Sequence, residues 1–182
     1  WERSGNFVMR RNENYWGPPA KIEEILYKVI KEDAARIAAL ESGQADLISN
    51  IPPHEVARLK SNPRLQVQPV QGLRPIFLVL SPAYKPLDNP KVRRAITQAI
   101  DREGLIKHIL EGNAYPLIGL LSPQVFGYDP GAKAYPYDLQ NSKQLLKEAG
   151  FGSGFEIEYY SPTGRYPKDL EIAQVIVEQL SK

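Results

Sequence analysis

Two short segments of the sequence combine residue types that can bind a polar ligand. Arg74 and Phe77 lie in the run Leu-Arg-Pro-Ile-Phe, where a guanidinium can offer a planar fork of donors to a carboxylate. Thr163, Arg165 and Tyr166 lie in the run Thr-Gly-Arg-Tyr, which joins a hydroxyl, a charge and an aromatic ring. Each segment also has a plain structural interpretation: a solvated arginine beside a core phenylalanine in the first, and an ordinary turn in the second. These five residues are the candidate ligand-binding residues.

The sequence gives no positive support for catalysis, a resident metal or a cofactor. It contains no cysteine, which excludes a thiolate zinc site, a disulfide framework and a cysteine nucleophile. The two histidines, His54 and His108, show no metal-binding spacing, and neither a phosphate loop nor a G-x-S-x-G nucleophile motif is present. Nothing indicates that any two carboxylates converge, and these include Asp46, Asp88, Asp101 and Asp169. We therefore predict no catalytic residue, no metal ligand and no cofactor.

Composition limits the classes of partner. The 182 residues are 42% hydrophobic and 24% charged, values typical of a folded globular protein. The net charge is only +2 and the basic residues are interspersed with acidic ones, so a nucleic-acid partner is not expected. No apolar run approaches the length of a membrane span, and the first residues lack the regions of a signal peptide.

The secondary structure that must position these residues is predicted most clearly in the segment from Asn89 to Arg102. Asn89 is a favourable N-cap, and Pro90 suits the first helical position because its missing N–H costs nothing there. Asp101 and Asp138 predict the starts of two further helices in the same way. The apolar residues of the first helix recur at the spacing of one helical face: Val92, Ala95, Ile96, Ala99 and Ile100.

Strands are expected between the helices. Residues 7–11 and 25–30 predict a hairpin, and residues 33–42 predict a helix with Asp33 as its N-cap and Gly43 as its stop. Further predicted strands cover 45–49, 65–70, 75–81 and 155–160, with 45–49 completing a β-α-β unit and 75–81 buried on both sides. A short helix after Pro52-Pro53, a loop over 115–137 and a last amphipathic helix over 170–180 complete the pattern, which is that of an α/β fold.

Several segments resemble one family in the same order along the chain. The clearest is KPLDNPKVRRAITQAIDREGLIKHILEGNA, and others are NENYWG, DAARIAALESGQADLISNIPPHEVARLKSNP, GYDPGAKAYPYDLQNSKQLLKEAGF and SPTGRYPKDLEIAQVIVEQL. Together they are similar to the family 5 extracellular solute-binding proteins, the dipeptide, oligopeptide and nickel receptors of ABC importers. The matches extend over nearly the whole chain.

The resemblance implies part of a two-lobe fold of the periplasmic-binding-protein type II kind, truncated at both ends. Residues 1–74 would belong to lobe one, 75–81 would cross between the lobes, and 82–182 would open lobe two. The run from Leu73 to Phe77 would then lie where the inter-lobe cleft forms, and the segment of Arg165 would face the cleft from lobe two.

The function that the resemblance implies is capture of a solute, with peptide as the expected class, and its delivery to an ABC permease. The receptor would be periplasmic or extracellular and held at the membrane by a lipid anchor outside this fragment. The charged residues that hold peptide termini would come largely from other parts of the receptor, so the chain alone is expected to bind weakly or not at all. Its uncovered apolar surfaces would also favour self-association.

Two alternatives stay open. A receptor of the same family could bind a nickel chelate, an opine or a sugar, because nothing in these residues selects peptide. In a different class, the chain could be part of an α/β enzyme whose catalytic residues lie elsewhere.

Overall fold

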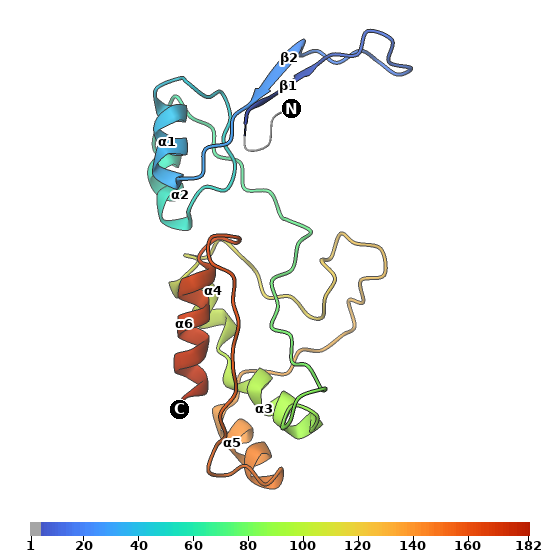
Figure 1. The fold of residues 1–182 in the computed structure, drawn as a ribbon, viewed down its shortest axis with the longest axis vertical. Coiled ribbons are helices and arrows are strands. Elements are labelled where there is room, and N and C mark those ends of the chain that lie inside the picture. The colour runs from blue at the N-terminus through green and yellow to red at the C-terminus, as the bar shows by residue number, and fades with distance from the viewer. Residues whose placement is uncertain (1–4) are drawn as a thin grey trace. The chain divides into compact units, whose positions relative to one another are not determined.

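The computed structural model describes residues 5–182, and these form two compact units, over residues 5–51 and 52–182 (Figure 1). The boundary between the units lies inside the segment expected to belong to lobe one. Residues 1–4 of that segment lie outside the described residues. The assignment of 1–74, 75–81 and 82–182 to lobes therefore stays a prediction.

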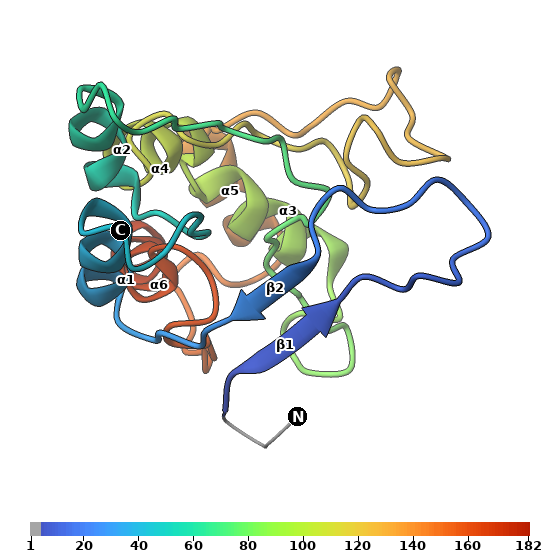
Figure 2. The ribbon, with the colours of Figure 1, turned by 90° about the horizontal axis from the view of Figure 1, so that it is seen from above.

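The first unit contains the predicted hairpin. Strands β1 (Phe7–Arg10) and β2 (Glu24–Tyr27) are antiparallel, with Phe7 opposite Tyr27 (Figure 2). The rings of this cross-strand pair stack with their centroids 4.7 Å apart, an arrangement that adds to the ladder hydrogen bonds. The prediction of paired strands is confirmed, with ends shifted by a few residues.

Helix α1 (Asp33–Glu41) follows, and its start differs by one residue from the prediction. Glu32 occupies the N-cap position without a side-chain capping bond, and Asp33 is the first helical residue. Asp33 instead pairs with the guanidinium of Arg36, one turn along the helix. The same guanidinium donates to the carbonyl oxygen of Asn50 over 3.1 Å, so Arg36 ties the helix start to the chain beyond the helix end.

Four predicted strands have no strand hydrogen bonding. Within residues 5–182 the β1–β2 pair is the only sheet, so 45–49, 65–70, 75–81 and 155–160 are irregular and the expected β-α-β unit does not form. A strand satisfies its backbone groups only through a partner strand, and none of these segments is paired in the described structure. The prediction that 75–81 is buried on both sides is also wrong.

The second unit is helical. Its helices are α2 (Pro53–Lys60), α3 (Pro90–Ala99), α4 (Arg102–His108), α5 (Leu139–Glu148) and α6 (Asp169–Leu180). The three predicted caps are confirmed. The side chain of Asn89 accepts from the N–H of Lys91, that of Asp101 from Gly104, and that of Asp138 from Asn141.

The core of this unit lies where α3 packs against α5 and α6. All five apolar residues predicted for the face of α3 and its C-terminus are buried. In addition, the hydroxyl of Ser142 on α5 donates to the carbonyl of Ala95 on α3 over 2.8 Å, and Figure 1 shows the two helices side by side. The stripe predicted for α6 is only partly confirmed, because Ile176 is buried whereas Leu170 and Val177 stay about half exposed.

Candidate functional site

The loop of residues 163–166, the Arg165 loop, precedes α6. It is held by Asp169, the first residue of that helix. The carboxylate of Asp169 accepts from the N–H of Gly164 at 3.0 Å, Arg165 at 2.8 Å and Tyr166 at 3.1 Å. It also accepts from the N–H of Leu170, and the side chain as a whole is buried. Both carboxylate oxygens are thus used, and three consecutive N–H groups of the predicted turn converge on one side chain.

This arrangement keeps the carboxylate charged. Burial alone would raise the pKa of Asp169, but its four backbone hydrogen bonds outweigh burial and lower the pKa below its ordinary value. The charge also lies at the N-terminus of α6, where the helix dipole favours an anion. The loop is therefore tied to the helix by charge-assisted bonds at neutral pH.

The side chains of this loop remain available for a ligand. The guanidinium of Arg165 lies over the ring of Tyr166, 5.4 Å from its centroid. Within the described part of the chain, the guanidinium makes no ion pair or hydrogen bond, and Thr163 is exposed. Stacking on the ring restricts the arginine while leaving its in-plane donors free to meet a carboxylate.

The segment of Arg74 and Phe77 is held less firmly. Both residues are exposed, Phe77 to 56%, so the alternative of a core phenylalanine is wrong. The nearest attachment lies at Gly72, whose carbonyl accepts from the hydroxyl of Tyr115 at 3.3 Å and from that of Ser122 at 3.4 Å. These bonds connect the segment to the long loop over 115–137 but leave Arg74 itself without a partner among residues 5–182.

The two predicted sets of ligand-binding residues are not linked to each other in the described structure. In the residues that the structure describes, no hydrogen bond, ion pair or ring contact links Arg74 or Phe77 to the loop of Arg165. Their assignment as ligand-binding residues stays a prediction. The residue that organises the second group is Asp169, which the sequence alone presents only as one of several carboxylates. The available signal was its place at a helix start, three to five residues after a turn.

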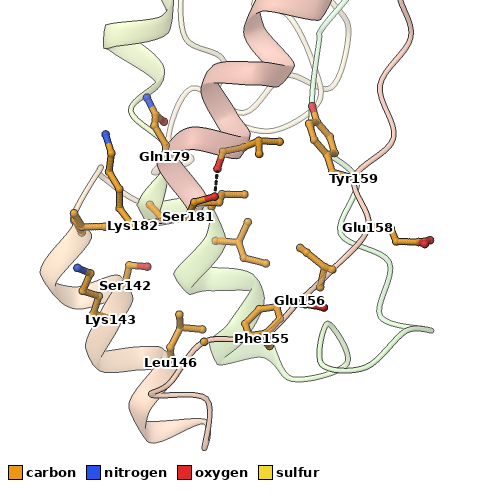
Figure 3. A pocket seen from close by; sticks show the side chains of 17 residues that line it. Ser142, Lys143, Leu146, Phe155, Glu156, Glu158, Tyr159, Gln179, Ser181 and Lys182 are labelled. Carbon is orange, nitrogen blue, oxygen red and sulfur yellow. Dashed lines mark hydrogen bonds between the residues drawn. The ribbon is translucent and has the colours of Figure 1, made fainter.

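A groove of about 570 Å³ lies elsewhere in this unit, between α3, α5, the end of α6 and the extended chain over 154–159 (Figure 3). Its apolar walls include Ile96, Leu146 and Phe155, the last two of which are labelled in Figure 3. None of the five predicted ligand-binding residues lines it. The groove is thus separate from the candidate site.

The described residues contain neither a cluster of metal-binding side chains nor a helix that could cross a membrane. Across residues 5–182, no three side chains of His, Asp or Glu gather in a group that could hold a metal ion. The helices described there are also too short or too polar for a membrane crossing.

Comparison with known proteins decides the family. The family described as bacterial extracellular solute-binding proteins, family 5 Middle, matches residues 1–182. The chain belongs to this family. It spans about a third of the length of the relatives it matches, as the following comparisons show.

The family 5 chain has relatives with different ligands. The dipeptide-binding protein of Escherichia coli is 30% identical over 88% of this chain and 30% of its own length. Heme-binding protein A of Haemophilus influenzae is 29% identical over 94% of this chain and 32% of its own. Among solved structures, the periplasmic binding protein DppA of Helicobacter pylori, in complex with the peptide STSA, matches with a TM-score of 0.86. It is 32% identical over 99% of this chain and 35% of that one.

These matches confirm the predicted family and the class of fold. The similar structure from Helicobacter pylori is a periplasmic binding protein, and the family consists of solute-binding proteins.

Proposed function

We propose that the chain is part of the substrate-capture component of an ABC importer, and that it contributes to binding a peptide in a cleft between two lobes. The observation that carries this proposal is the Arg165 loop. It combines a fixed backbone, a free guanidinium and an adjacent ring in a chain of this family. The receptor would be periplasmic or extracellular, lipid-anchored at the membrane, and would pass its ligand to a permease.

Peptide is the proposed ligand class. A peptide carries a C-terminal carboxylate, and a guanidinium with unused donors can bind it through two parallel hydrogen bonds. Tyr166 offers contact area and Thr163 a hydroxyl, while Arg74 and Phe77 would contribute from the inter-lobe segment. The similarity to a dipeptide-binding protein and to a peptide complex supports this choice over a chelate, an opine or a sugar.

The mechanism would be binding without covalent chemistry, so the protein would not be an enzyme. Contacts that a ligand makes to both lobes exist only when the lobes are closed, and the ligand therefore shifts the population toward the closed state. Specificity would reside in the side chains facing the cleft.

The test is calorimetric titration of the complete receptor that contains this chain with the tetrapeptide Ser-Thr-Ser-Ala and with its C-terminal amide. We expect the free acid to bind more tightly. Arg165→Ala should weaken binding of the free acid about tenfold to a hundredfold, because a charged hydrogen bond is lost. Arg64→Ala, which removes an exposed arginine outside the predicted site, is the matched control and should leave affinity unchanged.

Two results would contradict the proposal in different ways. Tight binding of heme or a nickel chelate with no response to any peptide would reject the ligand class. Unchanged affinity of Arg165→Ala for the free acid would reject the assignment of this arginine.

A further inference from the structure

The backbone of the Arg165 loop has already used its hydrogen-bond donors. The N–H groups of Gly164, Arg165 and Tyr166 all point to the carboxylate of Asp169, at distances from 2.8 to 3.1 Å. Three consecutive N–H groups beside a helix N-terminus would otherwise form a concave surface that attracts anions. Here that surface is filled by a carboxylate of the chain itself.

We propose that Asp169 is a positioning residue for ligand recognition: it fixes the backbone of residues 164–166, so that the loop reads the ligand through the side chain of Arg165 and not through its own N–H groups. This inference rests on the proposed function, in which Arg165 contacts the ligand. It goes further because it assigns a role to a residue that does not touch the ligand.

The backbone of the loop needs such an anchor. Gly164 has a φ of 74° and Lys168 has a φ of 59°, both in the left-handed region. Glycine adopts this region without cost, but a lysine does not, so the turn that precedes α6 carries strain at Lys168. The four bonds to Asp169 and an ion pair of 2.7 Å between Lys168 and Glu171 offset that strain.

The carboxylate also affects which group of the ligand the loop can bind. If the three N–H groups were free, they would compete with the guanidinium for the ligand's carboxylate. With Asp169 occupying them, and with the ammonium of Lys168 paired to Glu171, the guanidinium of Arg165 is the cationic group that remains for a ligand in this turn, and it lies over the ring of Tyr166. A ligand carboxylate therefore has one defined position on this loop.

The first test needs no ligand and no variant. Amide hydrogen exchange, followed by NMR in the unliganded wild-type chain, should be slowed at least tenfold at Gly164, Arg165 and Tyr166 relative to Thr163, after correction for intrinsic rates. Equal protection factors at all four positions would overturn the inference, whatever the ligand proves to be.

The second test separates positioning from general stability. In the complete receptor, Asp169→Asn should weaken binding of Ser-Thr-Ser-Ala at least tenfold, because the amide offers one acceptor oxygen where the carboxylate offers two. Adding Asp169→Asn to Arg165→Ala should cause little further loss, since the carboxylate acts through the arginine. Glu178→Gln is the matched control, an exposed acidic residue of the same helix that pairs with Lys182 near the helix end and not with the loop, and it should not change affinity.

The outcomes are distinguishable. If Arg165→Ala binds like the wild type, the proposed function fails, while the exchange rates still decide whether Asp169 fixes the loop. If Asp169→Asn weakens binding equally with and without Arg165, the effect is general and the positioning role is rejected. Gly164→Ala provides a second variant should Asp169→Asn fail to fold. It strains the same turn at a φ of 74° with no atom within 4 Å of the added carbon, and should also weaken binding.

Discussion

The face of α3 and the stretch before it are similarly apolar, yet they are buried very differently. Val92 and Ile96 on α3 are exposed to 0% and 5%, whereas Phe77 and Val79 in the stretch 75–81 are exposed to 56% and 70%. A helix satisfies its own backbone hydrogen bonds, so one packed face is sufficient to stabilise it. An extended segment needs a partner strand at its edges as well as cover on its faces, and this stretch has no paired strand in the described structure.

The difference predicts where stability resides. Leu78 and Leu80 of the stretch are packed against the core, but their neighbours face solvent. Substitutions on α3 should therefore be costly, and substitutions at the outward positions of 75–81 should be tolerated.

Ile96→Ala should have the largest effect, a loss of about 2–5 kcal/mol in the free energy of unfolding, because it leaves a cavity in a packed core. Val79→Ala is the matched comparison and should change it by no more than about 0.5 kcal/mol. Urea unfolding followed by far-ultraviolet circular dichroism measures both. Equal losses at the two positions would show that the stretch is as firmly packed as the helix.

Substitution of Gln98 on α3 should have the second-largest effect on the free energy of unfolding. Its buried amide accepts from Asn141 at 2.8 Å and from the guanidinium of Arg94 at 3.2 Å, and donates to the carbonyl of Pro136 at 3.4 Å. Gln98→Ala leaves these groups without a partner and should lower the free energy of unfolding by about 1–3 kcal/mol.

The control for that substitution is Gln144→Ala on α5, whose exposed amide donates to Glu148 at 3.1 Å. It should be close to neutral in the same urea experiment. A neutral Gln98→Ala would mean that the side chain of Gln98 adds nothing to the backbone bond from Asp138 that also holds the end of the long loop, and would remove one reason why this helix is the more stable region.

The helices could be predicted from sequence because their signals are local. Asn89, Asp101 and Asp138 each cap a helix with a bond to a residue two or three positions away. Strands could not be predicted from local signals in the same way, because a strand needs a partner strand, and that partner can be distant in the sequence. The hairpin succeeded because its two strands are close together along the chain.

The sequence predicts which residue types could bind a ligand at the candidate site, but it does not predict that Asp169 holds the loop in place. Arg165 and Tyr166 stand out by chemistry, whereas Asp169 acts on backbone N–H groups, which every residue except proline possesses. The exposure of Phe77 could not be predicted either, since an apolar run gives no information about which of its faces is covered.

Asn89→Ala should have a smaller effect, about 1 kcal/mol, because it removes the 2.9 Å bond from the N–H of Lys91 to the cap. Glu32→Ala is the comparison, at an N-cap whose side chain makes no capping bond, and should change stability by a few tenths of a kcal/mol at most. The urea midpoint reports both. A larger loss at Glu32 would contradict the view that α3 is stabilised by its cap and α1 by Arg36.

Acid should produce the smallest effect, confined to low pH. Because hydrogen bonding lowers the pKa of Asp169 in the folded chain, the unfolded chain takes up a proton more readily. The carboxylate therefore contributes stability that is fully present above the ordinary pKa, near 3.8, and is lost as the pH falls through the folded value. Glu171, whose pKa is lowered by its bond to Lys168, adds a loss of the same sign.

Urea midpoints measured from pH 7 to pH 3 test this for the wild type and Asp169→Asn. The wild type should be constant down to about pH 5 and then decline, with a steeper decline than the variant, since the variant has no proton to gain at this position. Parallel declines would mean that the loop is not held by a charged carboxylate. The Arg165 loop would then be no better fixed than the stretch around Arg74, and would no longer be the better-defined ligand contact.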